Sequence, residues 1–123
     1  PTGLAAFAAG LGKLSPAERE RVAVVFVSVD PERDEPRRLA EYAAWFDPHI
    51  RGVTGTAAEI VAATALFGAT FHKVWPRGAS DYVIDHSALG YVVAPDGRLV
   101  AELPHAAAAD AIAAALRPWL TLP

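Results

Sequence analysis

The sequence contains neither cysteine nor methionine in its 123 residues. It therefore offers no disulfide, no reactive thiol and no soft sulfur ligand for a metal ion. The usual evidence for a redox compartment is also missing, because neither a disulfide framework nor a set of free thiols is present.

Other absences exclude whole classes of function. No apolar run approaches the roughly 20 residues that a membrane-spanning helix needs, so we expect no membrane contact from these residues. The formal net charge of -3 gives no basic field of the kind that nucleic-acid binders show. No Gly-rich phosphate loop, Ser-His-Asp arrangement or close acidic pair indicates hydrolysis or phosphoryl transfer.

The residues that are present predict one domain over residues 1–123, because 53% of them are hydrophobic and supply a single core. Helical spacing of apolar residues covers residues 1–14 and 37–46, and a continuous β-branched run covers residues 22–29. Such a run is typical of a parallel strand that is buried on both faces.

The second half of the chain reads as a helix, an extended segment, a hairpin and a last helix. Thr56 and Glu59 match a capping box before a helix that Gly68 ends, and residues 69–74 are compatible with an extended segment. Residues 89–94 and 98–103 flank a Pro-Asp-Gly turn and predict an antiparallel hairpin. A closing helix is expected over residues 106–116.

This order of elements resembles the C-terminal bulk of a thioredoxin-like fold, an α/β sandwich. In that fold the first helix follows a central strand, and this sequence begins at Pro1, within the predicted first helix. Without a neighbour, the 22–29 run would expose an apolar strand edge. We therefore expect the domain to be N-terminally incomplete, with its central strand and cysteine loop before Pro1, or a second chain to cover this edge.

Three sequence motifs, taken in order and with their spacing, resemble those of a known protein family. Residues 25–34 (VFVSVDPERD), residues 52–56 (GVTGT) and residues 81–87 (DYVIDHS) are followed by Tyr91 and by the turn at residues 95–97. In this order and spacing they are similar to hallmark segments of the Sco/SenC copper chaperones, and the likeness covers nearly the whole chain.

The resemblance implies a copper site built from two cysteines and a distant histidine. Family members carry Cys-x-x-x-Cys-Pro at the start of the first helix, and Pro1 and Thr2 look like the residues that follow the second cysteine. Of these three family ligands, only the histidine has a counterpart in this sequence, which is His86. A solitary histidine often satisfies only a local hydrogen bond, so that alternative stays open for His86.

The chemistry of such a site is independent of the family. Cu(I) prefers polarizable thiolates, whereas imidazole nitrogen also serves Cu(II), so the mixed ligand set holds both oxidation states. A helix N-terminus favours the thiolate form of a cysteine. A single imidazole does not hold copper against competing ligands, so we expect these 123 residues alone to bind copper weakly or not at all.

Three acidic residues are candidates for supporting roles. Asp85 is placed to orient the imidazole of His86, or else points to solvent. Asp30 and Asp34 flank Pro31, and the favoured interpretation is that one or both cap the helix beginning near Pro36. The alternative is a role for this acidic loop in docking a partner.

The leading functional hypothesis is a copper metallochaperone for the copper centre of cytochrome c oxidase, acting on subunit II or another copper protein of the envelope. The first alternative is a thiol-disulfide oxidoreductase acting on a partner's copper-ligand cysteines, an enzymatic activity that needs cysteines upstream. The second is a cysteine-less binding module of the same fold. The resemblance implies the periplasmic side of the inner membrane, reached through an N-terminal tether, or the mitochondrial intermembrane space.

Overall fold

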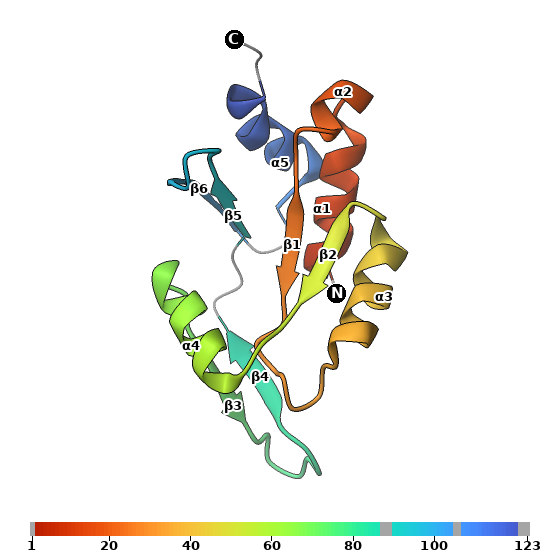
Figure 1. The fold of residues 1–123 in the computed structure, drawn as a ribbon. Helices are drawn as coiled ribbons and strands as arrows, with labels where there is room; N and C mark the ends of the chain where they lie inside the picture. Colours follow the sequence, from red (N-terminus) through yellow and green to blue (C-terminus); the bar gives the residue numbers. More distant parts are fainter. Residues whose placement is uncertain (1, 87–89, 105–106, 121–123) are drawn as a thin grey trace.

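A computed structural model describes residues 2–86, 90–104 and 107–120, excluding the side chains of residues 2, 3 and 84–86. Helices and strands are mixed in the first half of the chain, and four consecutive strands precede the last helix (Figure 1). The helices are α1 Thr2–Gly12, α2 Pro16–Arg19, α3 Pro36–Phe46, α4 Ala57–Leu66, α5 Ala109–Leu116 and the 3₁₀ turn η1 Arg117–Trp119. The strands are β1 Val24–Val27, β2 Ile50–Val53, β3 Phe71–Val74, β4 Val83–His86, β5 Gly90–Val93 and β6 Leu99–Leu103.

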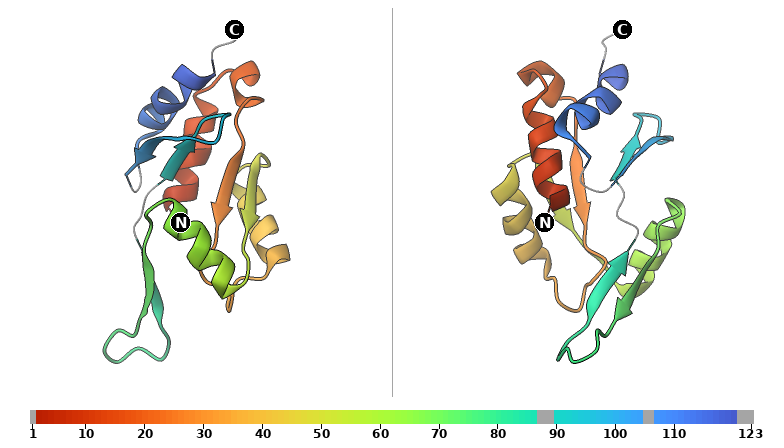
Figure 2. Two further views of the ribbon diagram at one scale, coloured as in Figure 1. Left: turned by 60° about the vertical axis from the view of Figure 1, so that its left-hand side comes forward. Right: turned by 180° about the vertical axis from the view of Figure 1, so that it is seen from behind.

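The described strands form three two-stranded sheets. Strands β1 and β2 are parallel and are joined through α3, with Val24 opposite Ile50 and Val27 opposite Val53. The pairs β3–β4 and β5–β6 are antiparallel. In the views of Figures 1 and 2, β5 lies on the side of β1 that faces away from β2.

The core lies between helices α1, α3 and α5 and one face of the β1–β2 pair. The fully buried Ile112 of α5 belongs to a second cluster with Val92 and Leu103, whereas the fully buried Leu11 of α1 belongs to the first cluster. Val24 and Phe26 of β1 pack against this cluster, whereas Val25 and Val27, which alternate with them, are 55% and 43% exposed. The prediction of a strand buried on both faces is therefore wrong for the described residues, because these helices pack against a single face of β1.

Several local predictions are confirmed. Thr56 accepts a hydrogen bond from the amide of Glu59, and the Glu59 carboxylate accepts one from the amide of Thr56, which completes the capping box of α4. Gly68 and Gly97 have φ angles of 67° and 91°, which are left-handed conformations that favour glycine. Gly68 follows the end of α4 and Gly97 lies in the turn between β5 and β6, as the sequence predicts.

Other local predictions need correction. The sequence predicts no strand around the GVTGT motif, but Gly52 and Val53 belong to strand β2. The polar stretch 15–21 contains the short helix α2, which begins with a capping box between Ser15 and Glu18. The closing helix begins at Ala109, later than the predicted residue 106, which lies outside the described residues.

The β3–β4 hairpin projects from the rest of the molecule. Figure 2 shows it as a long arm whose tip points away from the sheets of β1–β2 and β5–β6. Within the described ranges, its two strands pair only with each other. Its orientation must therefore be set by side-chain contacts with other elements.

Candidate functional site

The loop that follows β1 is held tightly at the end of the parallel strand pair. Ser28 and Asp30 are 4% and 7% exposed. The amide of Ser28 donates to the carbonyl of Val53 (2.9 Å), and the hydroxyl of Thr54 donates to the carbonyl of Ser28 (3.2 Å). The Ser28 hydroxyl donates to Asp34 and accepts a hydrogen bond from the Asp30 amide (3.1 Å). These bonds fix the position of both aspartates.

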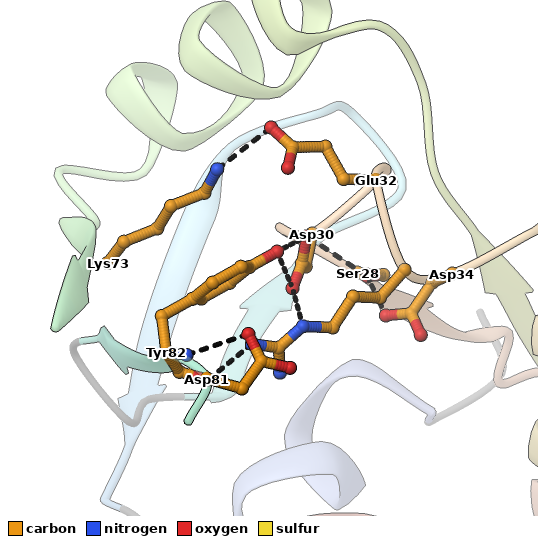
Figure 3. A network of polar contacts seen from close by, with 8 residues as sticks. Ser28, Asp30, Glu32, Asp34, Lys73, Asp81 and Tyr82 are labelled. Carbon is orange, nitrogen blue, oxygen red and sulfur yellow. Dashed lines mark hydrogen bonds and ion pairs between the residues drawn. The ribbon is translucent and has the colours of Figure 1, made fainter. Parts of the chain in front are cut away.

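Asp30 meets a tyrosine from a distant part of the chain (Figure 3). The hydroxyl of Tyr82, the residue before β4, lies 3.0 and 3.1 Å from the two carboxylate oxygens of Asp30. Arg33 Nε lies 3.3 Å from Asp30 Oδ2. Burial, and next the hydrogen bond to Asp30, raise the pKa of Tyr82, so the phenol remains a donor at neutral pH.

Cationic side chains hold the ring and the backbone of Tyr82. The Arg33 guanidinium lies 3.6 Å from the ring centroid and donates to the carbonyl of Tyr82 and, at 3.3 Å, to Asp81 Oδ1. Lys73 Nζ lies 4.7 Å from the same centroid and 2.8 Å from Glu32 Oε1. The hydrogen bond to Glu32 is the main cause that raises the pKa of Lys73. Residues 28–34 are thus connected to β3 and to the residues that lead into β4.

The prediction that Asp30 or Asp34 caps α3 is wrong. Glu35 occupies the N-cap position, and the described residues give this helix no side-chain cap. Pro36 at the first helical position has no amide hydrogen, so one of the amides that a cap would satisfy is missing. The two aspartates instead bind the hydroxyls of Ser28 and Tyr82.

His86 and Asp85 lie at the end of β4. The Cα of His86 is opposite that of Phe71, and the Cα of Asp85 is opposite that of His72. Neighbouring positions alternate between the two faces of a strand, so these residues occupy positions on opposite faces. Their side chains lie outside the described residues, and their roles stay predictions.

A family model described as SCO1/SenC matches residues 1–121 of this chain. The chain belongs to the SCO1/SenC family. Two solved structures of SCO1/SenC relatives resemble it along most of its length. Apo Sco1 from Thermus thermophilus is 40% identical with a TM-score of 0.84, covering 96% of this chain and 69% of that one. Bradyrhizobium japonicum ScoI, solved with copper bound, is 34% identical with a TM-score of 0.79, covering 97% and 74%.

Curated SCO1/SenC relatives are much longer than this chain. Protein SCO1 homolog 1, mitochondrial, from Arabidopsis thaliana is 34% identical over 100 residues, which are 81% of this chain and 30% of that protein. The chain thus spans about a third of that relative. The likeness to Sco1 structures confirms the predicted thioredoxin-like fold.

The described residues of this SCO1/SenC chain do not complete a copper site. They contain no group of three or more His, Cys, Asp or Glu side chains placed to hold a metal ion, and the sequence has no cysteine. None of the helices in the same described ranges is long and apolar enough to cross a bilayer.

The contacts that join residues 28–34 of this SCO1/SenC chain to Lys73, Asp81 and Tyr82 form a polar network. The sequence predicts only part of this network. The sequence marks Asp30 and Asp34 as candidates, but not Tyr82, Arg33 or Lys73. The signal for Tyr82 was its place in the DYVIDHS motif beside Asp85 and His86. No pattern along the chain pairs it with Asp30, which lies 52 positions away.

Proposed function

We propose that this chain is the larger part of a copper metallochaperone domain that prepares or delivers copper for the copper centre of cytochrome c oxidase. The observation that carries the proposal is the likeness, across 97% of this chain, to a ScoI structure with copper bound. The SCO1/SenC family match over residues 1–121 supports it.

In this proposal the copper ion is the cargo, and His86 supplies one ligand to it. The other two ligands are thiolates of a segment that precedes Pro1, next to the start of α1. The position of α1, which begins at Thr2, supports this arrangement because a helix N-terminus lowers the pKa of a nearby thiol. Two thiolates and one imidazole suit both Cu(I) and Cu(II).

The same segment is proposed to supply the central strand. Among the described residues, β1 pairs only with β2 and β5 only with β6, so each of β1 and β5 has a free edge. A strand before α1 and parallel to β1 would make a right-handed crossover through α1, the handedness that nearly all such connections have. It would also protect the edge of β1 from association with another chain.

The client in this proposal is subunit II of the oxidase or another copper protein of the envelope. The location is the periplasmic side of the inner membrane, or the mitochondrial intermembrane space; the name of the Arabidopsis relative describes that protein as mitochondrial. Asp30 also bonds to Tyr82, which leads into the β3–β4 hairpin, so any docking role of this loop would act through the hairpin as well.

Copper titration against competing chelators tests the proposal. The protein extended by the native residues before Pro1 should bind one copper ion tightly, and residues 1–123 alone should bind it weakly. His86→Ala in the extended protein should weaken binding by about tenfold or more. His49→Ala is the matched control, because His49 is exposed and pairs with Asp47 at 2.9 Å. Equal copper affinity in all four proteins would contradict the proposal.

The protein extended by the native residues before Pro1 also tests the two alternative functions, a thiol-disulfide oxidoreductase and a cysteine-less binding module. Disulfide exchange with a partner's copper-ligand cysteines, undiminished in His86→Ala, would favour the oxidoreductase, because exchange needs thiolates and no imidazole ligand. A native segment without cysteine before Pro1 would favour the binding module.

A further inference from the structure

The β3–β4 hairpin carries His86 but has no sheet partner among the described strands. In Figure 2 it extends away from the body of the molecule. A hairpin without neighbours on either edge is free to change its angle to the body unless side chains hold it. The position of His86 therefore depends on whatever fixes the hairpin.

Residues 28–34 contact both β3 and the residue that leads into β4. Lys73 of β3 bonds to Glu32, and Tyr82, the residue before β4, bonds to Asp30 (Figure 3). Arg33 adds a bond to the carbonyl of Tyr82 and stacks on its ring. The loop itself is bonded to β2 and to the residue after it, through Val53 and Thr54. A continuous set of contacts thus runs from the β1–β2 pair to the hairpin.

The Tyr82–Asp30 bond is the strongest of these contacts. The Asp30 side chain is only 9% exposed, and a buried carboxylate is costly unless donors satisfy it. Tyr82 donates to it, and Arg33 neutralises it. The Lys73–Glu32 pair is 36% and 67% exposed, and exposed ion pairs contribute little. Loss of the Tyr82 hydroxyl should therefore loosen the hairpin more than loss of Lys73.

We propose that Tyr82 is a positioning residue, whose hydroxyl, held by Asp30, orients the β3–β4 hairpin so that His86 reaches the metal. This inference rests on the proposed function. Tyr82 lies directly before β4 and precedes His86 by four positions, or roughly 13 Å of extended chain, so a small rotation at Tyr82 is amplified at His86. Cu(II) depends on the imidazole more than Cu(I) does, because thiolates alone suit Cu(I).

Tyr82→Phe in the protein extended through the native residues before Pro1 tests the inference. It removes one oxygen and keeps the ring on which Arg33 stacks. The expected result is a loss of roughly tenfold in Cu(II) affinity, a changed Cu(II) electron paramagnetic resonance spectrum, and a Cu(I) affinity close to that of the unmodified protein. Tyr91→Phe is the matched control, since the described residues give the buried Tyr91 hydroxyl no hydrogen-bond partner. It should change none of these quantities.

Amide hydrogen exchange of the copper-free protein provides a second readout. Tyr82→Phe should speed exchange in β3 and β4 while leaving β1 and β2 protected, whereas general unfolding would expose all four strands. Asp30→Asn keeps an acceptor for Tyr82 and should show a smaller effect than Tyr82→Phe.

Two outcomes would overturn the inference in different ways. If His86→Ala loses Cu(II) affinity but Tyr82→Phe keeps both the affinity and the spectrum, the positioning role is wrong and the proposed function stands. If His86→Ala leaves Cu(II) binding unchanged, the ligand assignment fails and the positioning role fails with it.

Discussion

Asp30 shows how far a single residue can be interpreted from sequence. Its place in the VFVSVDPERD motif marks it as a candidate, and the sequence favoured a helix cap. The structure instead buries it and gives it the hydroxyl of Tyr82. Local propensity cannot anticipate a partner on a hairpin 52 positions away, because that contact depends on tertiary packing.

Replacement of Asp30 should cost more stability than replacement of a neighbouring carboxylate. Asp30→Ala removes the acceptor of Tyr82 and the partner of Arg33, and we expect it to lower the free energy of unfolding by about 2–3 kcal/mol. Glu35→Ala should cost less than about 0.5 kcal/mol, because the exposed Glu35 gives α3 no side-chain cap among the described residues. Urea unfolding measures both, and equal losses would contradict the role of Asp30.

Glu59 should make stability depend on pH. Its hydrogen bond to the backbone amide of Thr56 is the main cause that lowers the pKa of Glu59 below its usual value. A lowered pKa in the folded state means that stabilisation is present at neutral pH and is lost as the pH falls through that pKa. Glu59→Gln should therefore be less stable than the unmodified chain at neutral pH, and the two should converge in acid. A difference that persists unchanged in strong acid would contradict this.

At the scale of helices and strands, the sequence predicted elements with strong periodicity and missed those without it. The spacing of Leu4, Phe7 and Leu11 indicates α1, and the β-branched run indicates β1. Strand β2 is short and contains Arg51 and Gly52, which weaken a strand signal. Its pairing with β1 is a long-range contact that outweighs local propensity.

Gly52 is required by the packing of α3 on β2. A Cβ at position 52 would overlap the backbone carbonyl of Leu39, which cannot move without shifting the helix. Gly52→Ala should therefore lower the free energy of unfolding by about 1–3 kcal/mol. Gly12→Ala, where no atom lies within 4 Å of the added Cβ, should leave stability unchanged or slightly higher. Thermal unfolding distinguishes them, and a neutral Gly52→Ala would contradict this packing.

At the scale of the whole molecule, the motifs predicted the fold family but not the relative placement of its parts. The hairpin at residues 90–103 was expected, and so was a free edge on β1. The projection of the β3–β4 hairpin was not, because it is held by Asp30, Arg33 and Tyr82 rather than by strand pairing. Side-chain networks between distant segments leave little trace in a single sequence.

The central claim is that this scaffold presents His86 to a copper ion opposite thiolates that precede Pro1. X-ray absorption of the copper-loaded extended protein tests it most directly, because sulfur and nitrogen ligands differ in bond length and imidazole has its own scattering pattern. We predict two sulfur ligands and one imidazole, with the imidazole signal lost in His86→Ala and kept in His49→Ala. A site without imidazole, or one whose imidazole survives in His86→Ala, would contradict the claim.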